Sequence, residues 1–159
     1  MKLSTKGRYA VMAMVDLARH AQVKPVSLSD IAARQEISLS YLEQLFARLR
    51  RAELVKSVRG PGGGYRLARG SADTRVSEII LAVDEPIKAT RCTEMGQPGC
   101  RADRSKCLTH DLWEELGNQI HVFLSSVSLN DVLERKLAPR IVEAPTATAA
   151  SSDSMAAAS

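Results

Sequence analysis

The chain has 159 residues, of which 45% are hydrophobic, enough for one domain of ordinary size with its own core. Residues 1–70 carry thirteen Lys or Arg against five Asp or Glu, whereas residues 71–159 carry nine against thirteen. A basic first half favours a polyanionic partner. The sequence contains no apolar run near the ~18 residues that a membrane span needs and no recognisable secretory signal, so we expect a cytoplasmic protein.

The first third of the chain predicts three helices. Residues 5–20 have apolar side chains at helical spacing, and Ser27 with Asp30 makes a capping-box-like start for a short second helix. Ser38 caps a third helix that runs to about residue 51. Its expected inward face consists of Leu39, Leu42, Leu45, Phe46 and Leu49. Two short helices joined by a tight turn, the second exposing polar side chains, are what reading the DNA major groove requires.

A β-hairpin is predicted next. Residues 54–59 and 65–68 are β-prone and flank the glycine-rich stretch 60–64, so that the hairpin forms a wing beside the helix-turn-helix. Arg59 at its tip can enter a minor groove. A nucleotide-phosphate loop is the competing interpretation, but the Gly-x4-Gly-Lys-Ser/Thr pattern is missing and no helix is expected directly after the glycines.

The second half predicts further helices around a polar loop. Residues 76–84 form a helix with Ile79, Ile80 and Val83 inward, and a long helix spans 108–125. Ser128 and Asp131 repeat the capping-box pattern before a last short helix. The fold class is therefore mainly α with a small β-hairpin, a winged helix-turn-helix followed by a long helix. The predicted units are a DNA-binding domain at 1–85, a metal-binding loop at 86–107, the long and short helices at 108–138, and a disordered tail at 139–159.

Every cysteine of the chain lies in the polar loop, in the arrangement Cys92-x7-Cys100-x6-Cys107-x2-His110. Thiolate and imidazole together suit zinc, copper or an iron–sulfur cluster, and cytoplasmic thiols stay reduced. Three cysteines and a histidine are a familiar zinc set, although zinc sites usually contain a closer cysteine pair. A two-iron cluster takes its ligands from a longer loop, so spacing alone leaves cluster and zinc open.

Four segments together resemble the iron–sulfur cluster regulators of the IscR family. They are Ile37-Ser-Leu-Ser-Tyr-Leu-Glu-Gln-Leu-Phe-Ala-Arg-Leu-Arg50, Val58-Arg-Gly-Pro-Gly-Gly-Gly-Tyr65, Cys107-Leu-Thr-His110 and the opening Leu3-Ser-Thr-Lys-Gly-Arg-Tyr-Ala10. The resemblance extends over roughly residues 1–135, with cysteine intervals longer than in the best-known members. It implies a 2Fe–2S cluster on Cys92, Cys100, Cys107 and His110, received from the iron–sulfur assembly machinery.

The resemblance also implies a homodimer on a pseudo-palindromic double-stranded DNA operator. Ser40, Glu43 and Gln44 would face base edges, Arg59 would enter the minor groove, and Arg50 with the wing would meet phosphates. The full set assigned to DNA is Ser38, Ser40, Tyr41, Glu43, Gln44, Arg50, Arg59, Gly60, Pro61 and Gly62. The residues assigned to dimerisation are Leu112, Leu116, Ile120 and Phe123.

The expected protein is a regulator, mainly a repressor, of cluster-assembly genes whose operator preference changes with cluster occupancy. No Ser/His/Asp or paired-carboxylate constellation indicates an enzyme. Nitric-oxide-responsive relatives typically hold their cluster without this histidine, so His110 disfavours them. A zinc-stabilised DNA-binding protein and a redox electron carrier are the remaining alternatives, and a basic winged helix has no purpose in the latter.

Overall fold

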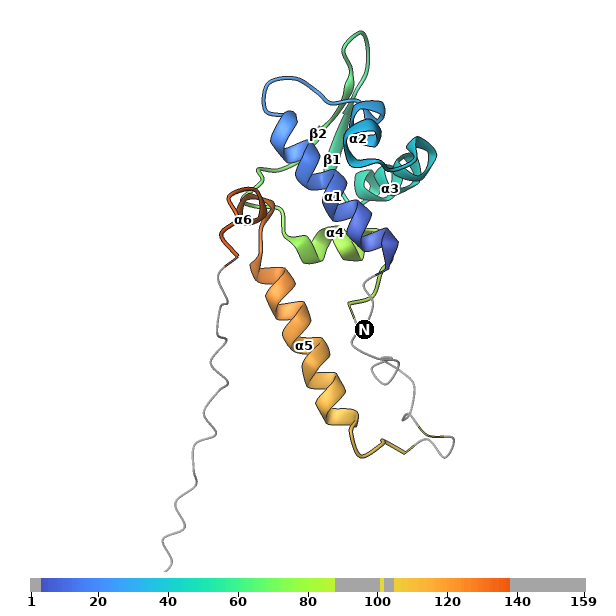
Figure 1. Cartoon of the computed structure of the whole chain (residues 1–159), viewed down its shortest axis with the longest axis vertical. Helices are drawn as coiled ribbons and strands as arrows, with labels where there is room; N and C mark the ends of the chain where they lie inside the picture. The colour runs from blue at the N-terminus through green and yellow to red at the C-terminus, as the bar shows by residue number, and fades with distance from the viewer. Residues whose placement is uncertain (1–3, 88–100, 102–104, 138–159) are drawn as a thin grey trace, which may run out of the picture.

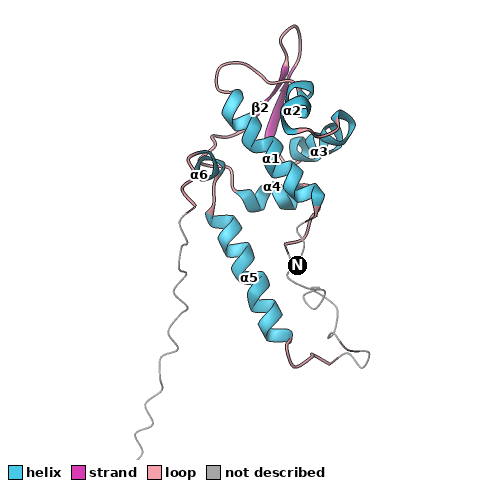
Figure 2. Ribbon diagram, in the orientation of Figure 1, coloured by secondary structure: helices cyan, strands magenta, loops and turns pink. Residues whose placement is uncertain are grey.

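The protein is described by a computed structural model that covers residues 4–87, 101 and 105–137. Figures 1 and 2 show a cluster of helices with one hairpin at its edge. A single long helix extends from this cluster. The elements in chain order are α1 (Thr5–His20), α2 (Leu28–Gln35), α3 (Leu39–Arg51), β1 (Val55–Val58), β2 (Gly64–Leu67), α4 (Val76–Ala82), α5 (His110–Ser126) and α6 (Leu129–Leu133). The expected fold class, a winged helix-turn-helix with a long additional helix, is confirmed.

Serine caps set the start of four helices. Ser4, Ser27 and Ser38 each accept a hydrogen bond from a backbone N–H in the first turn of α1, α2 and α3, which satisfies one of the orphan donors there. Ser128 does the same for α6, and its own N–H donates to Asp131 at 2.9 Å, which completes the expected capping box. These local signals explain why the helix starts are readable from the sequence.

The core forms around α1. Ala10, Ala13, Met14 and Leu17 of this helix are fully buried and share one apolar cluster with side chains of α2, α3, α4, α6 and β1. The remaining fully or almost fully buried members include Ile31, Leu42, Leu45, Phe46, Leu49, Val55, Ile79, Val83 and Leu129. Helices α2, α3, α4 and α6 are therefore packed onto one central helix, which fixes the position of the helix-turn-helix.

Leu39 departs from the predicted inward face of α3. Leu42, Leu45, Phe46 and Leu49 are buried as expected, but Leu39 is 41% exposed. It is the first residue of the helix, and its neighbours Ser38 and Ser40 are also exposed, so the first turn of α3 extends past the edge of the core.

An ion pair between a buried carboxylate and an exposed arginine ties α2 to α1. Asp16 of α1 is 4% exposed and accepts hydrogen bonds from the Arg34 guanidinium at 2.6–3.2 Å and from the Gln35 amide at 2.8 Å. Burial raises the pKa of the Asp16 carboxyl, but the hydrogen bonds from Arg34 and Gln35, with the charge of Arg34, bring it below its ordinary value. Asp16 is thus ionised at neutral pH and holds the first helix of the helix-turn-helix in place.

The hairpin is antiparallel, with Val55 opposite Leu67 and Val58 opposite Gly64. It is anchored at its base, because Tyr65 exchanges two backbone hydrogen bonds with Val26 at 2.7 and 3.0 Å. The Tyr65 ring meets Phe46 of α3 edge to face, with centroids 5.0 Å apart. The wing is therefore fastened both to the segment before α2 and to α3.

Helix α4 is two residues shorter than predicted. It ends at Ala82, and Asp84 adopts a left-handed conformation with φ of 55°, so the chain turns before Pro86 is reached. Helix α5 then extends away from the other helices (Figure 1), and only His110 and Gly117 of it are buried. Most of the predicted loop at 86–107 and all of the predicted tail at 139–159 lie outside the described residues.

Candidate nucleic-acid interface and metal centre

Helices α2 and α3 form a compact helix-turn-helix. Glu36 takes a left-handed conformation with φ of 53° directly after α2, and its N–H donates to the carbonyl of Ala32. Ile37, in the turn between α2 and α3, is buried, so its side chain anchors the turn in the core. Ser38 then uses its side chain to cap α3 through the N–H of Tyr41 at 3.3 Å. This hydroxyl therefore has a structural role besides the predicted contact with DNA.

The outer face of α3 carries most of the predicted reading residues. Ser40, Glu43 and Gln44 are all exposed at i, i+3 and i+4, which places them on one face of the helix. Leu39, which the sequence assigned to the core, is exposed beside them. Tyr41 differs, because it is half-buried and its ring meets Tyr9 of α1 edge to face at 6.0 Å between centroids. Only part of Tyr41 is therefore accessible to DNA.

The wing tip is exposed and shaped by two glycines. Arg59, Gly60, Pro61 and Gly62 are all exposed, and the hairpin end projects from the body of the protein (Figure 1). Gly60 and Gly62 have φ of 104° and 72°, a backbone conformation that other residues rarely adopt. A Cβ added at either position would meet nothing within 4 Å, so conformation and not crowding requires glycine there.

Arginine side chains continue the basic character beyond the reading face. Arg50 is exposed near the C-terminal end of α3 and lines an open hollow of about 940 Å³ together with Lys56 of β1. Two carboxylates, Glu53 and Glu78, line the same hollow, so the cations there are partly balanced by negative charge. Arg48, two residues earlier and one helical turn beyond Gln44, instead donates to the Val83 carbonyl at the C-terminal end of α4.

Two of the four predicted metal ligands are described, and they lie in one turn. The N–H of His110 donates to the carbonyl of Cys107 at 3.0 Å, which forms the turn that begins α5. The Cys107 sulfur lies 3.6 Å from the hydroxyl of Thr109, and the His110 side chain is 10% exposed. Cys92 and Cys100 lie outside the described residues. A thiol and an imidazole this close in the chain are suitable donors to one iron or zinc centre.

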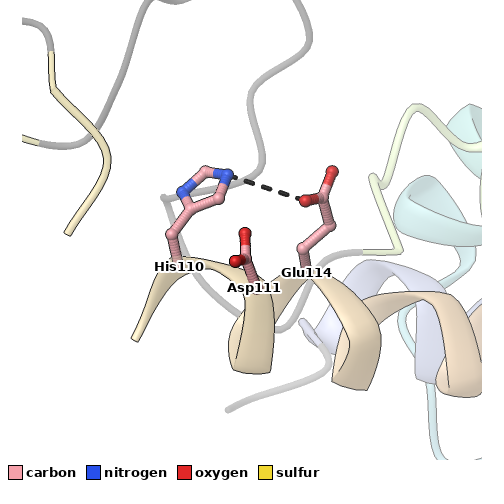
Figure 3. A group of neighbouring side chains, drawn as sticks. All are labelled: His110, Asp111 and Glu114. Carbon is pink, nitrogen blue, oxygen red and sulfur yellow. Dashed lines mark ion pairs between the residues drawn. The ribbon is translucent and has the colours of Figure 1, made fainter. Parts of the chain in front are cut away.

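Two carboxylates accompany His110 (Figure 3), which the cysteine pattern did not predict. One ligand atom from each of His110, Asp111 and Glu114 lies within 4.8 Å of the others. The His110 Nε2 is 3.7 Å from a carboxylate oxygen of Glu114, one helical turn further on. Asp111 and Glu114 are exposed, and exposed carboxylates commonly lie together without a metal. At 3.7 Å the Glu114 carboxylate is beyond hydrogen-bond distance of the ring nitrogen that faces it, although carboxylates are common outer partners of ligating histidines.

Helix α5 presents an uncovered apolar surface. Leu112, Leu116 and Phe123 are 61%, 39% and 42% exposed, and Ile120 is half-buried. Val122 is also 42% exposed, whereas the sequence-based set did not include it. Apolar side chains that are buried in most helices remain accessible along this one, which is typical of a contact surface.

Glu85 is a buried carboxylate that the sequence pattern did not predict, and it comes directly before the predicted metal-binding loop in the chain. Glu85 accepts hydrogen bonds from the backbone N–H groups of Ser4 and Gly7 at 2.6 and 2.7 Å. Burial raises the pKa of Glu85, but the hydrogen bonds from Ser4 and Gly7 lower it below its ordinary value overall. These partners are about eighty residues apart in the chain, so no local pattern predicts the contact; the small residue Gly7 is the one available signal.

The tight helix pair, the exposed polar face of α3 and the basic wing define a winged helix-turn-helix transcription regulator, which binds DNA and is not an enzyme. No helix within the described ranges is long and apolar enough to cross a membrane. Residues 3–135 match Rrf2, the family of iron-dependent transcriptional regulators. The chain belongs to the Rrf2 family.

Individual relatives agree with this assignment. The chain is 62% identical over 135 residues to a helix-turn-helix-type transcriptional regulator of Azotobacter vinelandii, covering 85% of this chain and 80% of the relative. It is 54% identical over 136 residues to the regulator IscR of Photorhabdus laumondii, covering 86% and 81%. The resemblance to the IscR type is thus confirmed.

Solved structures show the same fold. T. potens IscR matches with a TM-score of 0.68 and 43% identity, covering 86% of this chain and 88% of that one. CymR, the global cysteine regulator of B. subtilis, matches with a TM-score of 0.69 and 36% identity, covering 85% and 98%.

Proposed function

We propose that this protein is a cytoplasmic homodimeric repressor of iron–sulfur cluster assembly genes that senses cluster status through a bound 2Fe–2S cluster. The proposed ligands are Cys92, Cys100, Cys107 and His110, and the proposed cluster donor is the assembly machinery. The observation that carries this proposal is the Cys107–His110 turn at the start of α5, in a chain that is similar to regulators named IscR. The chain combines a basic winged helix with a turn that offers a thiol and an imidazole to a metal. Both features are explained if occupancy of the metal site controls DNA binding.

The donor set fits an iron–sulfur cluster and gives it particular properties. When bound, such a cluster supplies a redox-active centre that can be gained and lost. Replacing one thiolate by neutral histidine makes the site one unit less negative and raises its potential relative to an all-cysteine site. Because protonated imidazole cannot ligate, His110 makes binding sensitive to acid. The Glu114 carboxylate near its ring favours one orientation of the imidazole.

The identity of the metal centre can be tested by anaerobic purification followed by an absorption spectrum. Iron, sulfide and zinc are counted per chain. The proposal predicts visible bands and about two irons and two sulfides per chain. A colourless protein that holds one zinc, and takes up no cluster on reconstitution, would identify the centre as a structural zinc site on the same DNA-binding fold.

The proposed DNA contacts follow the exposed faces described above. Ser40, Glu43 and Gln44 would face base edges in the major groove from α3, and Arg59 would enter the minor groove from the wing tip. Arg50 and the wing backbone would meet phosphates, which position the protein but carry no sequence information. Glu43 has a distinctive role, because its carboxylate is repelled by phosphate yet accepts a hydrogen bond from a cytosine amino group.

Replacing Glu43 by glutamine is expected to relax operator choice, by about ten-fold or more in the ratio of affinities for preferred and rejected sites. The reason is that the variant loses a repulsive element. Glu53→Gln is a matched control, because it removes the same charge from an exposed residue just beyond α3. Competition binding with two operator sequences measures the ratio. Equal ratios in Glu43→Gln, Glu53→Gln and the original protein would reject this role.

The proposed dimer uses the exposed apolar side chains of α5. Two operator half-sites related by pseudo-twofold symmetry require two copies of α3, and an uncovered stripe on a helix that extends from the body can pair with the same stripe of a second copy. The stripe is defined by Leu112, Leu116, Ile120 and Phe123.

Replacing Leu116 by glutamate is expected to weaken dimerisation a hundred-fold or more, because the interface would then bury an unpaired charge. Asn118→Glu adds the same charge to another exposed position of α5, away from the stripe, and is expected to leave the dimer intact. Sedimentation equilibrium distinguishes the two. If the Leu116→Glu protein remained dimeric, the dimer interface would not include this stripe of α5.

A further inference from the structure

The three residues that follow α4 make contacts with two other helices. Asp84 turns the chain with φ of 55°, its N–H donates to the carbonyl of Leu81 at 3.0 Å, and the N–H of Glu85 donates to Ile80 at 3.3 Å. These bonds end α4 firmly and leave the Val83 carbonyl and the two carboxylates free to accept from elsewhere. We call residues 83–85 the α4 clasp.

One partner of the clasp is Arg48, on the proposed recognition helix α3. Its guanidinium donates to the Val83 carbonyl at 3.3 Å and forms an ion pair with the Asp84 carboxylate. The side chains of Arg48 and Asp84 are 37% and 75% exposed, so their ion pair lies at the surface, and the bond to the Val83 carbonyl directs the guanidinium toward the end of α4. Among the arginines of α3, Arg48 is thus engaged within the protein, whereas Arg50 is exposed at the open hollow beside β1.

The other partner of the clasp is the start of α1. Glu85 is 9% exposed and accepts from the backbone N–H groups of Ser4 and Gly7 and from the Ser4 hydroxyl. Anionic side chains are favourable at this end of a helix, where the backbone donors have no partners inside the helix. A Cβ at Gly7 would lie 2.7 Å from the Glu85 carboxylate, so glycine leaves the room that the contact needs.

We infer that Arg48 and Asp84 are positioning residues for DNA binding: the α4 clasp fixes α3 relative to α1 and α4, and Arg48 does not contact DNA. This inference rests on the proposed role of α3 as recognition helix. Base contacts require side chains to be placed within about 0.5 Å of the binding geometry, so a helix that shifts slightly on its support loses affinity without losing any contact residue. The clasp ties α3 to the central helix of the fold through two successive residues.

The competing role for Arg48 is an ordinary phosphate contact, and the two roles differ in two measurable ways. Each phosphate contact contributes about −0.9 to the slope of log K against log salt, whereas a positioning residue lowers affinity and leaves the slope unchanged. The second difference is the direction in which DNA affinity changes when the charge of Asp84 is removed. Removing a negative charge from a DNA-binding protein strengthens binding by simple electrostatics, but removing the partner of Arg48 weakens it if the clasp positions α3.

The experiment measures operator affinity of the full chain between about 50 and 200 mM salt for Arg48→Gln, Asp84→Asn and the control Arg50→Gln. Asparagine tolerates the positive φ at position 84, so the turn itself is retained. Iron and zinc per chain are counted so that all proteins are compared at equal metal content. Thermal unfolding checks that each variant is folded.

Arg48→Gln and Asp84→Asn are both expected to weaken operator binding about two- to five-fold with an unchanged slope, the loss typical of one partly exposed ion pair. Arg50→Gln is expected to reduce the magnitude of the slope by about 0.9. A slope change in Arg48→Gln, or tighter binding by Asp84→Asn, would overturn the inference. An unchanged slope in Arg50→Gln would instead count against the proposed phosphate contact, and the comparison of Arg48→Gln with Asp84→Asn would still decide the role of the clasp.

Discussion

Replacing Phe46 by alanine is expected to destabilise the protein by about 3–5 kcal/mol, the range for truncating a fully buried phenylalanine. Phe46 has no exposed surface and lies in the core cluster, and its ring also meets Tyr65 of the wing edge to face. A loss of this size is a large part of the total stability of a domain. Because the same side chain connects α3 to the hairpin, we also expect operator affinity to fall by more than the fraction of unfolded protein explains.

Chemical denaturation followed by circular dichroism measures the free energy of unfolding. Phe46→Leu is the matched control, since it keeps most of the apolar volume but removes the ring that meets Tyr65. It is expected to be clearly more stable than Phe46→Ala. If Phe46→Ala unfolded with the original free energy, the packing of α3 against the core would not be as described.

Replacing Cys107 by alanine is expected to abolish the visible chromophore and reduce bound iron from about two per chain to near zero. Cys107 is half-exposed and does not belong to the core clusters, so the winged helix should unfold at nearly the original temperature. Absorption spectra and iron counts of anaerobically purified protein measure the first effect, and thermal unfolding measures the second.

Leu108→Ala serves as the control for the Cys107 variant, because Leu108 adjoins the cysteine and is 98% exposed. It should retain the full spectrum. His110→Cys offers a further comparison: a fourth thiolate is expected to keep the iron but lower the reduction potential. A Cys107→Ala protein with an unchanged spectrum would remove this residue from the ligand set.

The helices and the wing were predictable because their signals are local. The expected helix at 5–20 coincides with α1, and the predicted caps Ser27, Ser38 and Ser128 all accept hydrogen bonds from the first turns of their helices. The hairpin follows from two β-prone runs around the glycines, whose positive φ at Gly60 and Gly62 needs that residue type. These features depend on neighbours within a few positions.

The rest depends on contacts between distant parts of the chain. Leu39 has the correct helical spacing for the core, but spacing does not reveal where the core ends, and its side chain is 41% exposed. The contacts of Glu85 with Ser4 and of Asp84 with Arg48 join residues separated by 81 and 36 positions, beyond any periodicity. At the candidate metal centre, the sequence pointed to Cys107 and His110 but not to Glu114, because a lone carboxylate on a helix is usually only a solvated charge.

Whether the cluster changes the DNA sequence that the protein prefers can be measured by selecting bound sequences from a pool of random DNA duplexes, with the cluster-loaded protein and again after cluster removal. We expect both states to select sites with two half-sites about one helical turn apart, and the preferred sequence to differ between the states. Identical preferred sequences and equal affinities in the two states would contradict this expectation, because the metal centre would then have no influence on which DNA the protein binds.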